Sequence, residues 1–260
     1  MRGIGAFGRI AFLGLFLAGA AAAQSAGGPG GGGAGPAATP SGELDLPLSH
    51  PREGQPTDPP VDPVDPPVDP IDLPPPIIWG EEIPVESETI YYVLDISGSM
   101  DWDPASYITP DGQQRTGPRI DRAKAELVRS ILGLARNFRF NVIAFDCSTL
   151  QWRRSLQPAD DGNKQSAIAW VNALWPRGAT GTGPATALAL ADKQNETVVL
   201  LTDGAPNCGA SSLSGHRRMI SSANTQGARV HVFGIAASGE YRSFCQGVAA
   251  DNRGSYFDVP

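Results

Sequence analysis

Histidine is scarce in this sequence, and the short motifs that mark common enzyme families are missing. Among 260 residues there are three histidines, His50, His216 and His231. The chain has no G-x-S-x-G nucleophile elbow, no G-K-S/T phosphate loop and no H-E-x-x-H metal helix. Neither nucleophilic nor zinc-dependent hydrolysis is favoured, and we predict that the protein is not an enzyme.

Cysteine is equally rare, and its spacing argues against the usual cysteine metal sites. The three cysteines, Cys147, Cys208 and Cys245, form no C-x-x-C pair. An odd number leaves at least one thiol unpaired in any arrangement of disulfides within the chain. From the expected order of strands we predict a Cys208–Cys245 disulfide, with three free thiols as the alternative.

The chain contains one prolonged apolar run at its N-terminus. Arg2 and Arg9 precede or flank an apolar stretch at residues 10–20, and the alanines at 21–23 provide a cleavage site. The run is shorter than the about 20 residues of a membrane span. We predict a signal peptide at residues 1–23, with an uncleaved anchor as the alternative, and no membrane span after cleavage. The mature protein would be secreted, periplasmic or associated with the cell envelope.

Core-forming residues are also sparse between residues 24 and 87, where glycine, proline and aspartate dominate. A glycine-rich part at residues 27–35 precedes a repeat of proline and aspartate at residues 58–70. Glycine favours a flexible coil and proline an extended one, so this composition cannot build a core. We predict a disordered linker at residues 24–87, either a stalk or a plain tail, followed by one domain at residues 88–260.

The net charge of −7 belongs to this linker rather than to the domain. Of the 27 acidic residues, 11 lie in residues 24–87, which leaves 16 in residues 88–260. Of the 20 basic residues, Arg2, Arg9 and Arg52 precede the domain, which leaves 17. A nearly neutral domain lacks the basic surface on which nucleic-acid binding depends. We therefore expect no nucleic-acid partner.

The chain does have a strand that ends in closely spaced oxygen side chains. The apolar run Tyr91–Leu94 leads into Asp95, and Ser97 and Ser99 follow at alternate positions. Residues two apart in a strand face the same side, and a turn at Gly98 lets Ser99 swing back towards them. Carboxylate and hydroxyl oxygens in one place suit a hard divalent cation. The alternative is a helix cap or turn cluster, where Asp and Ser are also common.

Two further segments follow in an order that matches a known family. Residues 178–183 read Gly-Ala-Thr-Gly-Thr-Gly, and residues 198–204 are an apolar run that ends in Thr-Asp-Gly. Together with the Asp-x-Ser-x-Ser run, they resemble the three metal loops of von Willebrand factor type A domains and their metal-ion-dependent adhesion site. The resemblance covers the chain from about residue 88 to the end.

The resemblance implies a ligand set and a way of binding. It assigns five oxygen ligands: Asp95, Ser97, Ser99, Thr180 and Asp203. The implied ion is Mg²⁺, and Mn²⁺ or Ca²⁺ would also accept an all-oxygen site. In the family, an Asp or Glu side chain of a partner protein completes the coordination sphere. Thr182 is expected to cap the helix that follows.

Alternating strand and helix patterns fill the rest of the predicted domain. Helical spacing of apolar residues predicts helices at 120–138, 164–174, 184–191, 215–226 and 240–250. Apolar runs predict strands at 91–95, 140–145, 197–202, 229–235 and 255–259, with a short edge strand at 150–156. This alternation predicts an α/β fold, a single doubly wound, mostly parallel sheet flanked by helices, Rossmann-like as in von Willebrand factor type A domains. Sites in such sheets form beyond the carboxyl ends of the strands.

Two features depart from the family pattern. Residues 101–118 form a long insertion after the first metal motif, with Trp102, Tyr107 and three aspartates. We interpret it as a specificity loop beside the ion, with a merely solvated loop as the alternative. The sequence stops at Pro260, directly after the last predicted strand, so we expect a C-terminal helix to be absent or very short.

These patterns favour an exported binding module that captures a carboxylate of a protein partner through a Mg²⁺-type site. The first alternative is a structural envelope protein in which the cation only stabilises the fold. A metal-dependent hydrolase ranks third.

Overall fold

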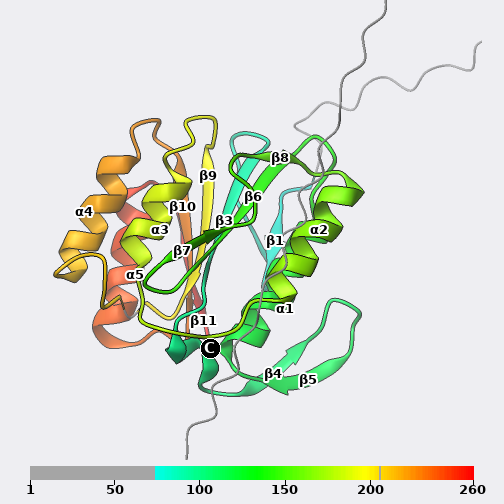
Figure 1. Cartoon of the computed structure of the whole chain (residues 1–260), viewed down its shortest axis with the longest axis horizontal. Helices are drawn as coiled ribbons and strands as arrows, with labels where there is room; N and C mark the ends of the chain where they lie inside the picture. The colour runs from blue at the N-terminus through cyan, green and yellow to red at the C-terminus, as the bar shows by residue number, and fades with distance from the viewer. Residues whose placement is uncertain (1–73, 205) are drawn as a thin grey trace, which may run out of the picture. The chain divides into compact units, whose positions relative to one another are not determined.

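Strands and helices alternate along the chain and produce a central sheet with helices on both faces (Figure 1). The structure is a computed structural model that describes residues 74–204 and 206–260. The predicted signal peptide and most of the predicted linker lie outside the described residues. In residues 74–204 and 206–260, every helix is too short or too polar to cross a membrane.

The sheet has seven strands in the order β11-β10-β9-β3-β6-β7, and β8 also pairs with β6. The strands are β3 (Thr89–Asp95), β6 (Arg139–Phe145), β7 (Thr149–Gln151), β8 (Gln157–Pro158), β9 (Thr197–Thr202), β10 (Arg229–Ile235) and β11 (Tyr256–Val259). All pairs from β11 to β6 are parallel, whereas β7 and β8 pair with β6 antiparallel. Strand β9 is buried at every position, as expected for a parallel strand covered on both faces.

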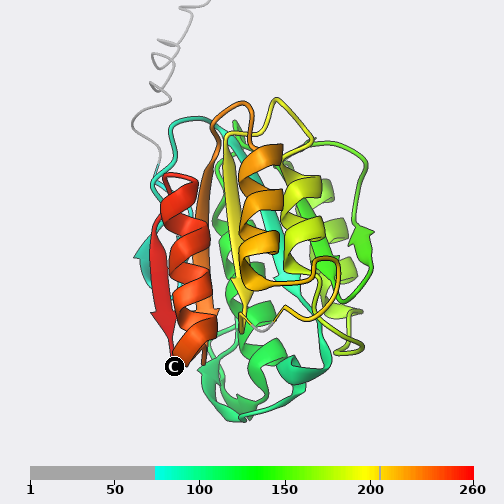
Figure 2. The ribbon, with the colours of Figure 1, turned by 90° about the vertical axis from the view of Figure 1, so that its left-hand side faces the viewer.

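Helices cover both faces of the sheet, with α3, α4 and α5 on one side and α1 and α2 on the other (Figures 1 and 2). The helices are α1 (Arg119–Gly133), α2 (Asp161–Asn172), α3 (Thr182–Ala189), α4 (Leu213–Ala223) and α5 (Gly239–Asp251). Side chains alternate along β3, so Tyr92 and Leu94 pack with α1 and α2, while Tyr91 and Val93 pack with α3, α4 and α5. The doubly wound sheet predicted from the sequence is therefore confirmed.

The predicted helices of the domain are all present, although α1 ends at Gly133 rather than at residue 138. The predicted strands are present except for the edge strand at 150–156, where only the short strands β7 and β8 form at its two ends. The strand at 229–235 matches the observed β10 residue for residue. The insertion at residues 101–118 is more ordered than predicted, because β4 (Ala105–Ile108) and β5 (Gln114–Gly117) pair as an antiparallel hairpin. This hairpin lies beside the start of α1 (Figure 1). Its strands are largely exposed and polar, so the sequence lacks the alternation of apolar and polar residues that would predict them.

The folded region begins before the predicted boundary at residue 88, which is a correction to the predicted linker. Strands β1 (Ile77–Ile78) and β2 (Glu81–Glu82) form a small hairpin. Ile78 and Ile83 are fully buried in the core cluster shared with α1. The Trp79 N–H donates a 2.8 Å hydrogen bond to Glu126 Oε2 of α1. The proline-rich composition before this hairpin concealed the few apolar residues that join the core.

We predict that Ile78→Ala lowers the free energy of unfolding by about 2 to 4 kcal/mol, because it removes buried methylenes and leaves a cavity. Ile77→Ala is the matched control, since Ile77 is the preceding residue of the same strand and is 45% exposed. Chemical denaturation of both variants measures the difference. Equal losses of stability would contradict the assignment of this hairpin to the core.

Candidate functional site

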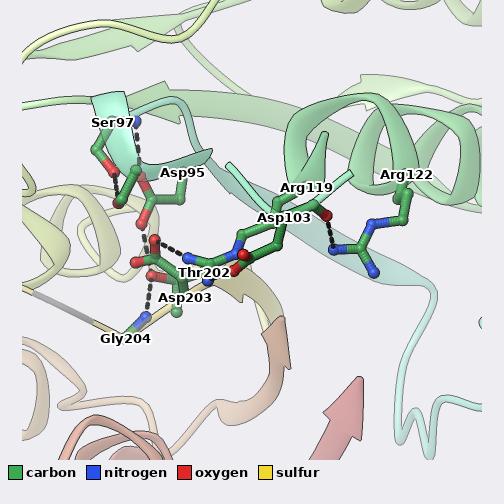
Figure 3. Close-up of polar contacts among 9 residues, drawn as sticks. Asp95, Ser97, Asp103, Arg119, Arg122, Thr202, Asp203 and Gly204 are labelled. Atoms are coloured by element: carbon green, nitrogen blue, oxygen red, sulfur yellow. Dashed lines mark hydrogen bonds and ion pairs between the residues drawn. The ribbon is translucent and has the colours of Figure 1, made fainter. Parts of the chain in front are cut away.

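The first predicted ligand loop converges as expected at the end of β3 (Figure 3). Asp95 is the last residue of β3 and is fully buried, and Ser97 is almost fully buried. The Ser97 N–H donates to Asp95 Oδ1 at 2.8 Å. The short helix η2 (Gly98–Asp101) turns the chain, so that the hydroxyl oxygens of Ser97 and Ser99 lie 3.2 Å apart. Ser97 occupies the N-cap position of η2 but its side chain makes no capping bond, which argues against a helix cap. The bond from the Ser97 N–H to Asp95 does have the geometry of an Asx turn, so the turn part of that alternative is present.

The third predicted loop brings a second buried carboxylate to the neighbouring strand end. β9 lies beside β3, with Leu94 opposite Leu201, so Asp95 and Asp203 emerge from adjacent carboxyl ends. Asp203 is 3% exposed. Between them, the Thr202 hydroxyl donates to Asp95 Oδ2 at 2.6 Å and accepts from the Gly204 N–H at 3.0 Å. These ends lie where the strand order reverses, the usual position of a site in a doubly wound sheet.

The second predicted loop is tied to the other two through the backbone. Thr180 is 2% exposed, its N–H donates to Asn207 Oδ1 at 2.8 Å, and its carbonyl accepts from the Asn207 N–H at 2.9 Å. The Gly98 N–H of the first loop donates to the Gly178 carbonyl at 3.1 Å. A Cβ at position 98 would lie 3.3 Å from that oxygen, so glycine permits the close approach. The structure thus joins all three loops at one edge of the sheet.

The predicted Cys208–Cys245 disulfide is wrong, because Cys208 is bonded to Cys147. Their Cα atoms are 5.8 Å apart, and the bond links the loop after β9 to the turn between β6 and β7. Cys245 is a free thiol on the buried face of α5, where burial and the charges of Asp203 and Asp95 raise its pKa to about 12. The sequence prediction assumed that the loop after β9 turns towards α5. It turns towards β6 instead.

Thr182 does not cap α3, contrary to expectation. The N-cap is Gly181, without a side-chain bond, and the Thr182 hydroxyl is buried with no hydrogen-bond partner in the described part of the chain. At the same helix start, the Gly183 N–H donates to His216 Nδ1 at 3.0 Å. His216 therefore holds the start of α3 through its Nδ1 atom.

Arg119 is the residue of this site that sequence reasoning missed. It is the first residue of α1, and its Nη1 donates to Asp203 Oδ2 at 3.0 Å. Its Nη2 forms an ion pair with Asp103, which lies just after η2 (Figure 3). The Arg119 side chain is 12% exposed. No motif could have indicated it, since the insertion at residues 101–118 separates Arg119 from the first metal loop in sequence.

The electrostatics of the two carboxylates favour an added cation. Burial, and secondarily the negative charge of Asp203, raise the pKa of Asp95 to about 7. The predicted donor set, two carboxylates and the hydroxyls of Ser97, Ser99 and Thr180, would be hard, which suits Mg²⁺, Mn²⁺ or Ca²⁺ better than a softer ion. Residues 74–204 and 206–260 contain no cluster of three or more His, Cys, Asp or Glu side chains arranged for a metal. A cation here would accordingly depend on hydroxyl oxygens and water as well as on the two aspartates.

The raised pKa of Asp95 predicts a pH dependence in metal-free protein. Because the folded-state pKa lies above the unfolded value of about 3.9, the contribution of Asp95 to stability is present at low pH and is lost as the pH rises through 7. Asp95→Asn should therefore gain about 2 to 3 kcal/mol relative to the unsubstituted protein between pH 5 and pH 8. Denaturant unfolding in EDTA at both pH values measures this. A difference that does not change with pH would contradict the burial of an ionised Asp95.

Comparisons with known proteins agree with this geometry. A family profile for the von Willebrand factor type A domain matches residues 113–258, downstream of the first metal loop. Inter alpha-trypsin inhibitor, heavy chain 4, of Mus musculus is 27% identical over 183 residues, which are 66% of this chain and 16% of that protein. Von Willebrand factor A domain-containing protein 3B of Homo sapiens is 29% identical over 102 residues, 39% of this chain and 8% of that protein. The chain thus spans less than a fifth of the length of these relatives.

Solved structures show the same fold at lower identity. The von Willebrand factor type A protein from Catenulispora acidiphila has a TM-score of 0.54 at 19% identity, over 66% of this chain and 38% of that one. The pilus adhesin SpaC from Lactobacillus rhamnosus GG, in its open conformation, has a TM-score of 0.52 at 17% identity, over 68% of this chain and 28% of that one. The family profile matches more than half of the residues of this chain, so the chain belongs to the von Willebrand factor type A domain family.

Proposed function

We propose that this protein is an exported binding module, not an enzyme, that holds a divalent cation and uses it to capture an Asp or Glu side chain of a protein partner. The observation that carries the proposal is the pair of buried carboxylates, Asp95 and Asp203, at adjacent strand ends beside the Ser97 and Ser99 hydroxyls. Arg119 offsets the charge of Asp203, and the buried carboxylate of Asp95 beside it would still favour an added cation. The proposed ligands are Asp95, Ser97, Ser99, Thr180 and Asp203, and the proposed ion is Mg²⁺.

Each ligand would have a role that follows from its fixed position. Asp95 is held by the Ser97 N–H and the Thr202 hydroxyl, so its carboxylate is already oriented before a cation arrives. Hydroxyl ligands add no negative charge, so Asp95 and Asp203 alone would offset the charge of the bound ion. Mg²⁺ would supply a coordination position open to exchange. A carboxylate of the partner is the group that such a position favours.

The known relatives support a role in protein interactions. One structure of the same fold is named as a pilus adhesin, and heavy chains of inter alpha-trypsin inhibitor are among the sequence relatives. We extend this to a protein exported through a signal peptide at residues 1–23, with residues before the folded domain as a linker. A secreted, periplasmic or envelope location follows from that proposal.

The hydroxyl of Thr180 provides a sharp test of the metal site. Thr180→Val keeps the side-chain volume but removes the proposed ligand, so it should weaken Mg²⁺ binding by at least about tenfold. Thr182→Val is the matched control, because Thr182 lies two residues away, is equally buried and has no hydrogen-bond partner within the described residues. Calorimetric titration of the purified protein with Mg²⁺ measures both. Absence of Mg²⁺, Mn²⁺ and Ca²⁺ binding by the unsubstituted protein would overturn the proposal.

The structural alternative predicts a different consequence of metal binding. A cation that only stiffens the loops should raise the melting temperature, and the metal-loaded protein should not bind carboxylates. A binding module loaded with Mn²⁺ should exchange a metal-bound water for added acetate. The relaxation rate of water protons near Mn²⁺ reports that exchange directly.

A further inference from the structure

The strongest unexplained feature beside the proposed metal site is a guanidinium between two carboxylates. Arg119 contacts buried Asp203 on one side and Asp103, whose side chain is 62% exposed, on the other (Figure 3). The Arg119 Nε–H is buried and has no acceptor within residues 74–204 and 206–260. All the side-chain hydrogen bonds described for Arg119 therefore go to carboxylates, one inside the site and one at its solvent edge.

Backbone contacts place this pair at the mouth of the site. The Arg119 N–H donates to the Trp102 carbonyl at 3.1 Å, and the Trp102 N–H donates to the Ser99 carbonyl at 3.2 Å. Arg119 is thus connected to the first metal loop through two backbone hydrogen bonds. The Asp103 carbonyl accepts from Arg122 Nη2 at 3.3 Å, so its backbone is anchored while its side chain faces solvent.

We infer that Arg119 is a second contact for the partner's carboxylate, and that Asp103 is an internal carboxylate that occupies this contact until the partner replaces it. The inference rests on the proposed function, because it requires a cation at Asp95 and Asp203. An Arg guanidinium suits the task, since its forked donors can hold one carboxylate while offering a second pair of N–H groups to another.

Formal charges support the assignment. Asp95 and Asp203 with a divalent cation sum to zero, so those three groups alone give little attraction for an acid. Arg119 makes the loaded site positive by one unit, which favours an incoming carboxylate. Among these five groups Asp103 returns the sum to zero, so it must move away for the full attraction of Arg119 to act. The 62% exposure of its side chain allows this by rotation alone. Arg122, whose Nη2 lies 3.3 Å from the Asp103 carbonyl, adds a further positive charge nearby.

Asp103 also has an uncommon backbone conformation. Its φ is +49°, in the left-handed region that is uncommon outside glycine and tolerated by Asp. Trp102, next to it, is 63% exposed and offers an apolar surface at the same edge. The first part of the insertion at residues 101–118 thus brings both an acid and an aromatic side chain to the metal face, where a partner would meet them.

The test uses Mn²⁺ as the metal and acetate as the carboxylate, with water-proton relaxation as the readout. Arg119→Gln should require about tenfold more acetate to displace Mn²⁺-bound water, because one charged hydrogen bond is lost. It should also bind Mn²⁺ more tightly, since Asp203 is released from the guanidinium. Asp103→Asn should require several-fold less acetate. A merely structural Arg119 would not weaken acetate binding while strengthening Mn²⁺ binding.

Arg136→Gln is the control, because Arg136 forms an exposed ion pair with Asp161 beyond the opposite end of α1. It should match the unsubstituted protein in both titrations. If Arg119→Gln and Asp103→Asn also match it in acetate response, the inference is overturned while the proposed function stands. If the unsubstituted protein does not bind Mn²⁺, or binds it without any response to acetate, the proposed function itself fails.

Discussion

The structure depends on one arrangement above all, the burial of the Asp95 carboxylate at the end of β3 next to Asp203. A buried carboxylate is unfavourable unless its oxygens are hydrogen bonded, and both oxygens of Asp95 have partners: the Ser97 N–H and the Thr202 hydroxyl. These bonds fix its orientation but supply no positive charge. Burial, and secondarily the charge of Asp203, therefore raise the pKa of Asp95 to about 7. A folded protein that maintains such a group gives up stability there, which is typical of a binding site rather than of a core.

The rest of the fold holds this edge of the sheet rigid. Parallel pairing of β3 with β9 sets Asp95 and Asp203 side by side, and helices on both faces exclude solvent from the strands. The loop that carries Thr180 is anchored by hydrogen bonds to its neighbours. Thr180 bonds with Asn207 and the Cys208 N–H, and the Gly98 N–H donates to the Gly178 carbonyl. Arg177 of the same loop forms an ion pair with Asp146, and the Cys147–Cys208 disulfide holds the adjoining loop after β9. Three loops distant in sequence consequently act as one surface.

Much of the fold was predictable from sequence because buried parallel strands are continuous apolar runs and the helices carry clear periodicity. The same reasoning placed Asp95, Ser97 and Ser99 together, since alternate residues of a strand share one face. It missed what depends on long-range contacts. The β1–β2 hairpin joins the core through a few residues after a proline-rich segment, and the partner of Cys208 depends on the direction of a loop.

Arg119 shows the limit most clearly. No local pattern marks an arginine that reaches a carboxylate 84 positions later in the chain, and its importance lies in charge rather than in a motif. Because of Arg119, the site contains a positive charge of its own beside the two buried carboxylates. Asp103 lies two residues before β4, so the hairpin β4–β5 begins next to this contact.

The central claim is that side-chain oxygens of the three loops surround one divalent cation. Crystals grown with Mn²⁺ and measured for anomalous scattering test it most directly. We expect a single strong anomalous peak in direct or water-mediated contact with Asp95, Ser97, Ser99, Thr180 and Asp203, at bond lengths of about 2.0 to 2.3 Å for the direct ligands. A peak elsewhere, or an Arg119 guanidinium filling the space between the two aspartates in Mn²⁺-saturated crystals, would contradict it.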